Sequence, residues 1–365
     1  MRSVIDIVDL SIEEINELIK TAIDINNNPL KYSESCKGKK LATLFYEPST
    51  RTRLSFEAAM IELGGHVLGL YGDSNSSESQ GESFADTVKT VSCYADIIAM
   101  RTSDEGAALV ASRAASIPVI NAGDGCHFHP TQTLADLLTI YRVKGTFDNL
   151  TIGFCGDLKY GRTVHSLLAA LSRYKGLKVV LISPQELKLD QYVKDDILIK
   201  YDIEFKETTS LEDSINTLDI LYMTRVQRER FDNIEEYEKV KNNYILTTDI
   251  MKKAKDDMIV MHPLPRVNEI SVKVDDDPRA CYFKQPLNGK YMRMALILKL
   301  LNIREENHIR EDVFKNKELI YNEYKCNNPR CVSQKEQELD QVFKIVDKNK
   351  NIVRCIYCDI GEPTK

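Results

Sequence analysis

The chain has 365 residues, enough for two or three domains and a substantial hydrophobic core. Its 49 basic and 55 acidic residues give a net charge of −6, whereas general nucleic-acid-binding proteins are usually basic. No apolar run reaches the length of a membrane span, and the first residues lack the apolar stretch of a secretory signal. We therefore expect a cytoplasmic protein with no nucleic-acid or membrane partner.

Helix and strand patterns alternate along the chain. A helix is predicted over residues 11–25, where apolar residues recur with helical spacing and Ser11 and Glu14 form a capping box. Apolar runs predict strands at 41–46, 95–100, 117–122, 150–156, 177–183, 219–224, 244–248 and 258–262. Helical patterns between them include 55–63, 84–94, 131–142, 163–174 and 291–301. Such alternation indicates parallel sheets covered by helices on both faces.

Two changes in composition divide the chain. Residues 143–149 separate two sets of α/β units, and residues 302–325 turn polar and charged. The last 40 residues are too few to fold on an apolar core alone, so a bound metal would supply the missing stability. The predicted fold class is α/β, with two doubly wound parallel-sheet domains and a small C-terminal metal-bound domain.

Polar or cationic segments follow six of the predicted strands, and five of the segments contain arginine. Ligands in open α/β sheets bind beyond the carboxyl ends of the strands. Polar loops are common after strands, but arginine at five of six ends is unexpected in an acidic protein. The pattern favours one shared site for anions.

The segment Pro48-Ser-Thr-Arg-Thr52 lies between a strand and a helix. Ser49 or Thr50 can cap that helix. The backbone amides of its first turn can bind phosphate or carboxylate, and the guanidinium of Arg51 can donate two hydrogen bonds to the same anion. An ordinary helix cap with a surface arginine would have the same sequence. The segment is not a P-loop, and the stretch Gly153–Gly161 is not the dinucleotide-binding GxGxxG, so a nicotinamide enzyme is not expected.

Two histidines, His127 and His129, precede a helix that Pro130 can begin. A metal site with these two ligands alone is weakly indicated. A neutral imidazole that donates to a developing oxyanion is the better functional interpretation for one of them. A histidine that merely caps the helix is the alternative. The predicted helix directs His129 and Gln132 to one pocket.

Four of the nine cysteines gather at the C-terminus, and the other five are scattered and interpreted as reduced thiols. The spacing of the four is x4, x23 and x2, which suits tetrahedral zinc; disulfides or free thiols are the alternatives. Four thiolates would close the coordination sphere, so the expected Zn²⁺ is structural rather than catalytic. The predicted ligands are Cys326, Cys331, Cys355 and Cys358.

Five segments of residues 4–304 closely resemble the catalytic chains of the aspartate carbamoyltransferase family: PSTRTRLSFE, HPTQT, GDLKYGRTVHSL, TRVQRER and HPLPR. The cysteine spacing with CNNPRC resembles the zinc domain of that family's regulatory chains. In the family, a nucleotide-effector domain precedes the zinc domain, but residues 306–325 are too few to form one. The resemblance implies a carbamoyl-phosphate-binding domain (1–131 and 288–305), an aspartate-binding domain (132–287), and a linker with the zinc domain (306–365).

The resemblance assigns roles to individual residues. Carbamoyl phosphate would be held by Ser49, Thr50, Arg51, Thr52, Arg101, His129, Gln132, Pro263 and Leu264, the last two through backbone carbonyls across a cis Leu264–Pro265 bond. Of these, Arg51, Thr52, Arg101 and His129 would take part in catalysis. Aspartate would be held by Arg162, Arg225 and Gln227.

In the family, active sites lie between the chains of a trimer, and a loop of the neighbouring chain completes each one. Here that loop is about residues 72–82, and counting back from Gly81 places Ser76 and Gln80 at its functional positions. The family has a lysine where Gln80 stands, so a cation has become a neutral amide. Losing one preorganised donor typically costs about 10²–10³ in rate.

The resemblance implies a homotrimeric transferase that passes the carbamoyl group of carbamoyl phosphate to L-aspartate, in pyrimidine synthesis. A carbamoyltransferase with another amine acceptor is the first alternative. A non-catalytic paralogue is the second, because Gln80 replaces the family lysine. The zinc domain would brace contacts between catalytic chains, and whether two trimers join through it stays open.

Overall fold

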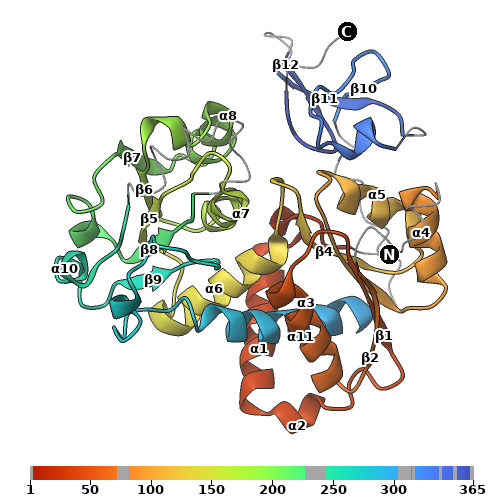
Figure 1. Ribbon diagram of the computed structural model, residues 1–365, viewed down its shortest axis with the longest axis horizontal. Coiled ribbons are helices and arrows are strands. Elements are labelled where there is room, and N and C mark those ends of the chain that lie inside the picture. The colour runs from red at the N-terminus through yellow and green to blue at the C-terminus, as the bar shows by residue number, and fades with distance from the viewer. Residues whose placement is uncertain are drawn as a thin grey trace. The chain divides into compact units, whose positions relative to one another are not determined.

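The computed structural model describes residues 3–71, 82–226, 244–302, 314, 317–336, 339–347 and 352–361. The chain divides into two units, Met1–Thr131 with Lys290–Lys365 and Gln132–Gly289. Both divisions fall inside helices, α6 (Pro130–Lys144) and α11 (Gln285–Asn302) (Figure 1). None of the described helices is long and apolar enough to cross a membrane.

The first unit begins with helices α1 (Ile12–Asn27) and α2 (Pro29–Tyr32). The capping box of α1 forms as predicted: the Glu14 amide donates to Ser11 Oγ at 3.2 Å, and the Ser11 amide donates to Glu14 Oε2 at 2.9 Å. Its apolar stripe is buried at Ile15, Leu18, Ile19, Ala22 and Ile25.

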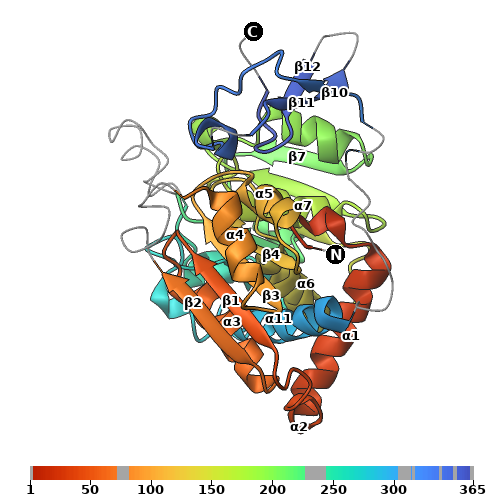
Figure 2. The same ribbon diagram turned by 90° about the vertical axis from the view of Figure 1, so that its right-hand side faces the viewer.

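A four-stranded parallel sheet forms the centre of this unit, in the order β2-β1-β3-β4. Its strands are β1 (Lys40–Phe45), β2 (His66–Tyr71), β3 (Ile97–Thr102) and β4 (Val119–Asp124). Helices α3 (Thr50–Glu62), α4 (Phe84–Ser92) and α5 (Ala107–Ala114) connect them (Figure 2). Strand β2 pairs with one edge of β1, and β3 pairs with the other edge. The strand order therefore reverses between β1 and β3, where open α/β sheets bind ligands.

The second unit contains a five-stranded parallel sheet in the order β7-β6-β5-β8-β9. Its strands are β5 (Thr151–Cys155), β6 (Lys178–Ile182), β7 (Glu204–Thr208), β8 (Ile220–Met223) and β9 (Ile259–Met261). Its helices include α7 (Arg162–Leu171), α8 (Gln191–Val193), the π-helical turn Lys194–Ile199 and α10 (Thr248–Met251). Here the strand order reverses between β5 and β8.

A C-terminal module (317–361) carries a three-stranded antiparallel sheet, β10 (Leu319–Tyr321), β11 (Val342–Asp347) and β12 (Ile352–Cys355). The module shares one apolar core with α4, α5 and one face of the first sheet. Ala42 and Ile98 contribute from the strands, and Val332, Phe343 and Tyr357 contribute from the module. The module is therefore packed on the first unit of its own chain.

The predicted fold class is confirmed, but several elements differ from the prediction. Helix α3 begins at Thr50 rather than at residue 55, so Arg51 and Thr52 lie in its first turn. The strand predicted at 244–248 is wrong: Leu246 makes an isolated bridge with Ile270, and Thr247 caps α10. The edge strands β2 and β7 were not predicted. Exposed, polar β7 has no apolar run to mark it.

Candidate functional site

The N-terminus of α3 lies at the carboxyl end of β1, beside the reversal point of the first sheet. Ser49 occupies the N-cap position, but its side chain makes no capping hydrogen bond. The first-turn amides are therefore not satisfied by the cap, and such amides can bind a phosphate. Thr52 is buried, whereas Thr50 and Arg51 are exposed. Of the two predicted capping residues, Ser49 is the N-cap, but it caps without a side-chain hydrogen bond, which strengthens the anion-binding interpretation.

Arg101 lies on the neighbouring strand β3, level with the carboxyl end of β1. It pairs in register with Phe45, and its carbonyl accepts the amide of Tyr46 at 2.9 Å. Its guanidinium Nη2 lies 3.1 Å from Glu47 Oε2, and its side chain is only 11% exposed. The carboxylate of Glu47 therefore restrains a largely buried cation next to the α3 segment. The first unit thus places Arg101 and the 49–52 segment at adjacent strand ends.

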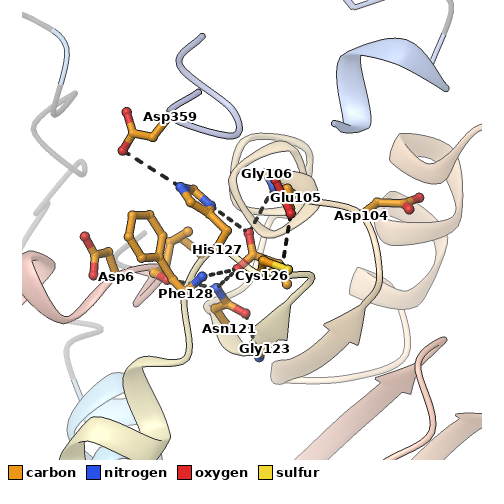
Figure 3. Close-up of polar contacts among 12 residues, drawn as sticks. Asp6, Asp104, Glu105, Gly106, Asn121, Gly123, Cys126, His127, Phe128 and Asp359 are labelled. Carbon is orange, nitrogen blue, oxygen red and sulfur yellow. Dashed lines mark hydrogen bonds and ion pairs between the residues drawn. The ribbon is translucent and has the colours of Figure 1, made fainter. Parts of the chain in front are cut away.

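The loop after β4 contains His127 and Phe128 (Figure 3). The buried carboxylate of Asp124 organises this loop. Its oxygens accept the Gly106 amide at 2.9 Å, the Phe128 amide at 3.0 Å and the Asn121 side-chain amide at 2.9 Å. His127 Nδ1 lies 3.1 Å from the same carboxylate. Burial lowers the pKa of His127, but the charges and hydrogen bonds of Asp124 and Asp359 outweigh burial and hold it well above its usual value.

The two histidines of the loop therefore have different surroundings. His127 is engaged by carboxylates, whereas His129 is buried next to Pro130, the first residue of α6. A histidine held as a cation between carboxylates cannot serve as a neutral donor. His129 is the better candidate for the oxyanion role assigned from sequence.

In the second unit, Thr224 joins the carboxyl ends of β5 and β8 at the reversal point. Its hydroxyl donates to the carbonyl of Cys155 at 3.1 Å and accepts the Asp157 amide at 2.8 Å. Arg162 begins α7 directly after the β5 segment, and Arg225 directly follows Thr224. Arg162 and Arg225, the two arginines predicted to bind aspartate, thus lie at this reversal point, and both are partly exposed.

The buried carboxylate of Asp136 joins α6 to β8 and α11. Its Oδ1 accepts the side-chain amides of Gln132 at 2.8 Å and Gln285 at 2.7 Å, and its Oδ2 accepts the Tyr222 hydroxyl at 2.9 Å. Because a carboxylate only accepts hydrogen bonds, it orients the Gln132 amide with Nε2 inward. The oxygen of Gln132 is then directed away from Asp136 and can accept an N–H from a ligand.

Replacing Asp136 with asparagine is expected to release this orientation, since a donor would face the Gln132 amide. For carbamoyl phosphate, the ligand that the resemblance implies for Gln132, we expect the KM to rise by about tenfold, the cost of one hydrogen bond to a charged group. Tyr222→Phe, which removes only the donor to Oδ2, should leave that KM within about twofold. Steady-state kinetics of both variants test this, and equal KM values for Asp136→Asn and the wild type would contradict it.

The loop after β9 is held by a buried histidine–glutamate pair. The Leu264 amide donates to His262 Nδ1 at 2.8 Å, so the ring proton lies on Nε2, which is 2.7 Å from Glu269 Oε1. Glu269 Oε2 also accepts the amides of Val267 and Asn268, both at 3.0 Å. The loop contains a cis Leu264–Pro265 bond, as predicted. The pair therefore fixes the backbone of Pro263 and Leu264.

This pair makes stability depend on pH. Burial raises the pKa of Glu269, but hydrogen bonds from His262 and the loop amides outweigh burial and lower it below 4.5. A carboxyl with a depressed folded pKa stabilises the protein above its unfolded pKa, and this stabilisation is lost as the pH falls through the folded pKa. The difference in melting temperature between the wild type and Glu269→Gln should be largest above pH 5 and shrink towards pH 3. A constant difference across that range would contradict this assignment.

Three predicted site residues, Ser76, Gln80 and Gln227, lie outside the described residues. Of the rest, the first unit holds Ser49, Thr50, Arg51, Thr52, Arg101 and His129, and the second holds Gln132, Arg162, Arg225, Pro263 and Leu264. Sequence reasoning missed the supporting residues Glu47, Asp136, His262 and Glu269. Of these four residues, only His262 lies within one of the quoted motifs, and Glu47 directly precedes another.

The four C-terminal cysteines come together as predicted. Their sulfur atoms all lie within 4.8 Å of one another and are buried. The Cys326–Cys358 and Cys331–Cys355 sulfurs are 3.6 and 3.8 Å apart, too long for disulfides of about 2.05 Å. Zinc–sulfur bonds of about 2.3 Å in a tetrahedron require sulfurs roughly 3.8 Å apart. The residues therefore fit a closed, structural Zn²⁺ site.

Three family models match the chain. They are the aspartate/ornithine carbamoyltransferase carbamoyl-P binding domain (residues 2–142), the Asp/Orn binding domain of the same family (148–300), and the metal binding domain of the aspartate carbamoyltransferase regulatory chain (318–361). The last match covers all four cysteines.

Individual relatives agree with these matches. Aspartate carbamoyltransferase catalytic subunits of Clostridium botulinum and Clostridium novyi are 59% and 61% identical over 303 and 302 residues, which cover 83% of this chain and 99% and 98% of theirs. The catalytic subunit of M. jannaschii aspartate transcarbamoylase is 47% identical with a TM-score of 0.78, over 84% of this chain and 99% of that one. Aspartate transcarbamoylase from Trypanosoma cruzi, solved with N-(phosphonacetyl)-L-aspartic acid, is 38% identical with a TM-score of 0.77, over 82% and 95%. The chain belongs to the aspartate/ornithine carbamoyltransferase family and carries, in addition, the metal-binding domain of an aspartate carbamoyltransferase regulatory chain.

Proposed function

We propose that the protein is an aspartate carbamoyltransferase, which converts carbamoyl phosphate and L-aspartate to N-carbamoyl-L-aspartate and phosphate in pyrimidine synthesis. The observation that carries this proposal is the placement of Arg101, which pairs with Phe45 and Glu47, and of the N-terminus of α3 at adjacent strand ends, where the order of the first sheet reverses. Backbone amides and a restrained guanidinium at adjacent strand ends suit a phosphorylated substrate.

The first unit would bind carbamoyl phosphate. Its phosphate would be held by the amides and side chains of Ser49, Thr50, Arg51 and Thr52. Arg101, His129 and Thr52 would donate to the carbonyl oxygen, where negative charge develops in the transition state. The oxygen of Gln132 and the carbonyls of Pro263 and Leu264 would accept the carbamoyl N–H groups.

The second unit would bind aspartate through Arg162, Arg225 and Gln227. Two arginines suit the two carboxylates of aspartate and favour a dicarboxylate amine over ornithine, which carries a second cation. Bringing two anionic substrates together requires such cations, and orientation then makes the attack effectively intramolecular.

In the reaction, the neutral amine nitrogen of aspartate attacks the carbamoyl carbon, and the carbon–oxygen bond to phosphate breaks. The departing phosphate takes the proton released by the amine. The chain's residues need only bind, orient and stabilise charge, so neither a covalent nucleophile nor a protein base is required. The zinc site is closed by four thiolates and takes no part in this chemistry.

Phosphate release from carbamoyl phosphate, measured with aspartate, glutamate, ornithine and other amines, tests the acceptor. We expect turnover with aspartate and at least about 100-fold less with ornithine, because each unpaired buried charge is strongly disfavoured. Faster turnover with another amine would assign a different acceptor. Absence of turnover with every acceptor, in folded protein with bound zinc, would favour the non-catalytic alternative.

We further propose that the active sites are shared within a homotrimer, with Ser76 and Gln80 supplied by a neighbouring copy. If so, Gln80→Lys should raise kcat by about tenfold or more, since one preorganised cation at the transition state is worth about 10²–10³. Gln80→Glu, which keeps the size of the side chain but adds a negative charge, should lower kcat. Equal kcat values for all three proteins would place residue 80 outside the active site.

A further inference from the structure

Helix α7 carries Arg162 as its first residue, but the start of this helix has no side-chain cap. Its N-cap residue is Gly161, which has no side chain that could accept the amides of the first turn. A Cβ atom at Gly161 would collide with the carbonyl oxygen of Asp157, so no capping side chain fits at this position. Contacts from neighbouring elements therefore have to fix the position of Arg162.

One such contact comes from Tyr222 of β8. The Thr163 side chain hydrogen-bonds to the Tyr222 hydroxyl, and Thr163 directly follows Arg162 in α7. Tyr222 is completely buried, and its ring packs on that of Phe154 of β5, with the ring centroids 5.7 Å apart. The two residues also pair in register within the parallel sheet. The sheet therefore holds the phenol in place beside the first turn of α7.

The direction of the two hydrogen bonds at the Tyr222 oxygen follows from Asp136. A phenol has one proton, and Tyr222 donates it to Asp136 Oδ2 at 2.9 Å. Burial and the negative charge of Asp136 raise the pKa of Tyr222 well above its usual value, so the proton stays on the phenol. The Tyr222 oxygen can then only accept a hydrogen bond from Thr163. The Thr163 hydroxyl is thereby held in one orientation.

The carboxylate of Asp136 also supports the groups assigned to the carbamoyl end of the substrate. Its Oδ1 accepts the side-chain amides of Gln132 and Gln285, and Gln285 Oε1 accepts the His262 amide at 2.9 Å. His262 in turn accepts the Leu264 amide. All of these residues belong to the second unit. One buried carboxylate therefore supports the carbamoyl contacts through Oδ1 and the start of α7 through Oδ2.

From these contacts we propose that Tyr222 is a positioning residue for aspartate, which holds Thr163 and thereby Arg162 at the start of α7. Tyr222 does not touch the substrate, because it is completely buried and its oxygen already has two protein partners. Its hydrogen bond from Thr163 serves the aspartate site and not the carbamoyl contacts. The inference rests on the proposed function, since it takes Arg162 as a ligand of aspartate.

Steady-state kinetics of full-length, zinc-bound Tyr222→Phe test the proposal. Without the phenol oxygen the Thr163 hydroxyl loses its acceptor, so we expect the KM for aspartate to rise by about fivefold, the effect of one hydrogen bond between neutral groups. The KM for carbamoyl phosphate should stay within about twofold of the wild type. Thr163→Val should raise the KM for aspartate by the same factor, whereas Thr163→Ser, which keeps the hydroxyl, should stay within about twofold.

The double variant with Tyr222→Phe and Thr163→Val distinguishes one shared bond from two independent effects. If both side chains act through the same bond, the KM for aspartate rises by about fivefold in the double variant as well, and not by the product of about 25-fold. The matched control is Tyr244→Phe, which in the same unit loses a hydroxyl hydrogen bond to the Thr209 carbonyl. Its KM for aspartate should equal that of the wild type.

Three results would overturn the proposal. The first is a wild-type KM for aspartate in Tyr222→Phe, and the second is a rise of about 25-fold in the double variant. The third is an equal increase in the KM values for aspartate and carbamoyl phosphate in Tyr222→Phe, which would indicate general destabilisation of the unit.

Hydrogen exchange separates failure of this inference from failure of the proposed function. Peptides covering residues 158–166 should exchange faster in Tyr222→Phe but not in Tyr244→Phe, whichever amine the protein accepts. If the wild type does not turn over aspartate but these peptides respond, the proposed function fails and the support of α7 by Tyr222 is retained. If the wild type turns over aspartate but neither its KM nor the peptides respond to Tyr222→Phe, the inference fails and the function remains.

Discussion

Arg101→Ala is expected to lower kcat/KM for carbamoyl phosphate by about 10³-fold, the larger end of the loss for one preorganised transition-state donor. Two effects combine, because the substitution removes a guanidinium that is 11% exposed and leaves the Glu47 carboxylate without its partner near an anionic substrate. Arg101→Lys keeps the charge but loses the two-pronged geometry, so we expect it to recover only part of the activity.

The matched control is Arg113→Ala, at an exposed position in the last turn of α5 in the same unit. Its kcat/KM should stay within about threefold of the wild type, as expected for a surface change away from the substrate. Steady-state kinetics with carbamoyl phosphate as the varied substrate compare the three variants. If kcat/KM fell by less than about tenfold in Arg101→Ala, Arg101 would not be a donor that stabilises the transition state.

Cys355→Ser is expected to abolish stoichiometric zinc binding and to unfold the C-terminal module. The other three sulfurs cannot close a tetrahedral site, and structural zinc supplies about 10–16 kcal/mol of folding free energy. Since the module shares an apolar core with α4 and α5, the first sheet should also lose stability. Metal analysis and calorimetric unfolding measure the two effects.

Cys93→Ser is the control for this experiment, because Cys93 is an exposed free thiol of the first unit. It should keep one zinc per chain and the wild-type melting temperature. If Cys355→Ser also kept one zinc per chain, the four-thiolate site would be wrong.

Much of the fold could be predicted because its strands are continuous apolar runs. The buried strands β1, β3, β5, β6, β8 and β9 all lie within or close to the predicted ranges. Edge strand β7 escaped prediction because four of its five residues are polar and the strand is largely exposed. Backbone pairing with β6, rather than burial of an apolar run, holds it in the sheet. Helix α3 begins earlier than its apolar pattern, because its first turn is polar and faces the predicted anion site.

The sequence motifs predicted the candidate substrate-binding residues, but not the residues that hydrogen-bond to them and hold them in place. Arg101 could be found because it ends an apolar run, but its partner Glu47 became evident only from the β1–β3 register. Asp136 and Gln285 are 149 residues apart in sequence, and no local pattern joins them.

The placement of the module on its own chain also could not be predicted. The contact between Glu105 and Asn328 spans 223 residues, and the cysteine spacing carries no information about it. The sequence instead suggested contacts between catalytic chains through the module. Those contacts stay a prediction, whereas the structure shows the module packed against α4 and α5 of its own chain.

The identity of the product tests the proposed activity most directly. Purified full-length protein with one zinc per chain would be given ¹³C-labelled carbamoyl phosphate and L-aspartate, and the carbonyl carbon followed by NMR. We expect labelled N-carbamoyl-L-aspartate in amounts equal to the phosphate released, with almost none from Arg101→Ala. Folded, zinc-bound wild-type protein that forms no labelled N-carbamoyl-L-aspartate would contradict the proposed activity.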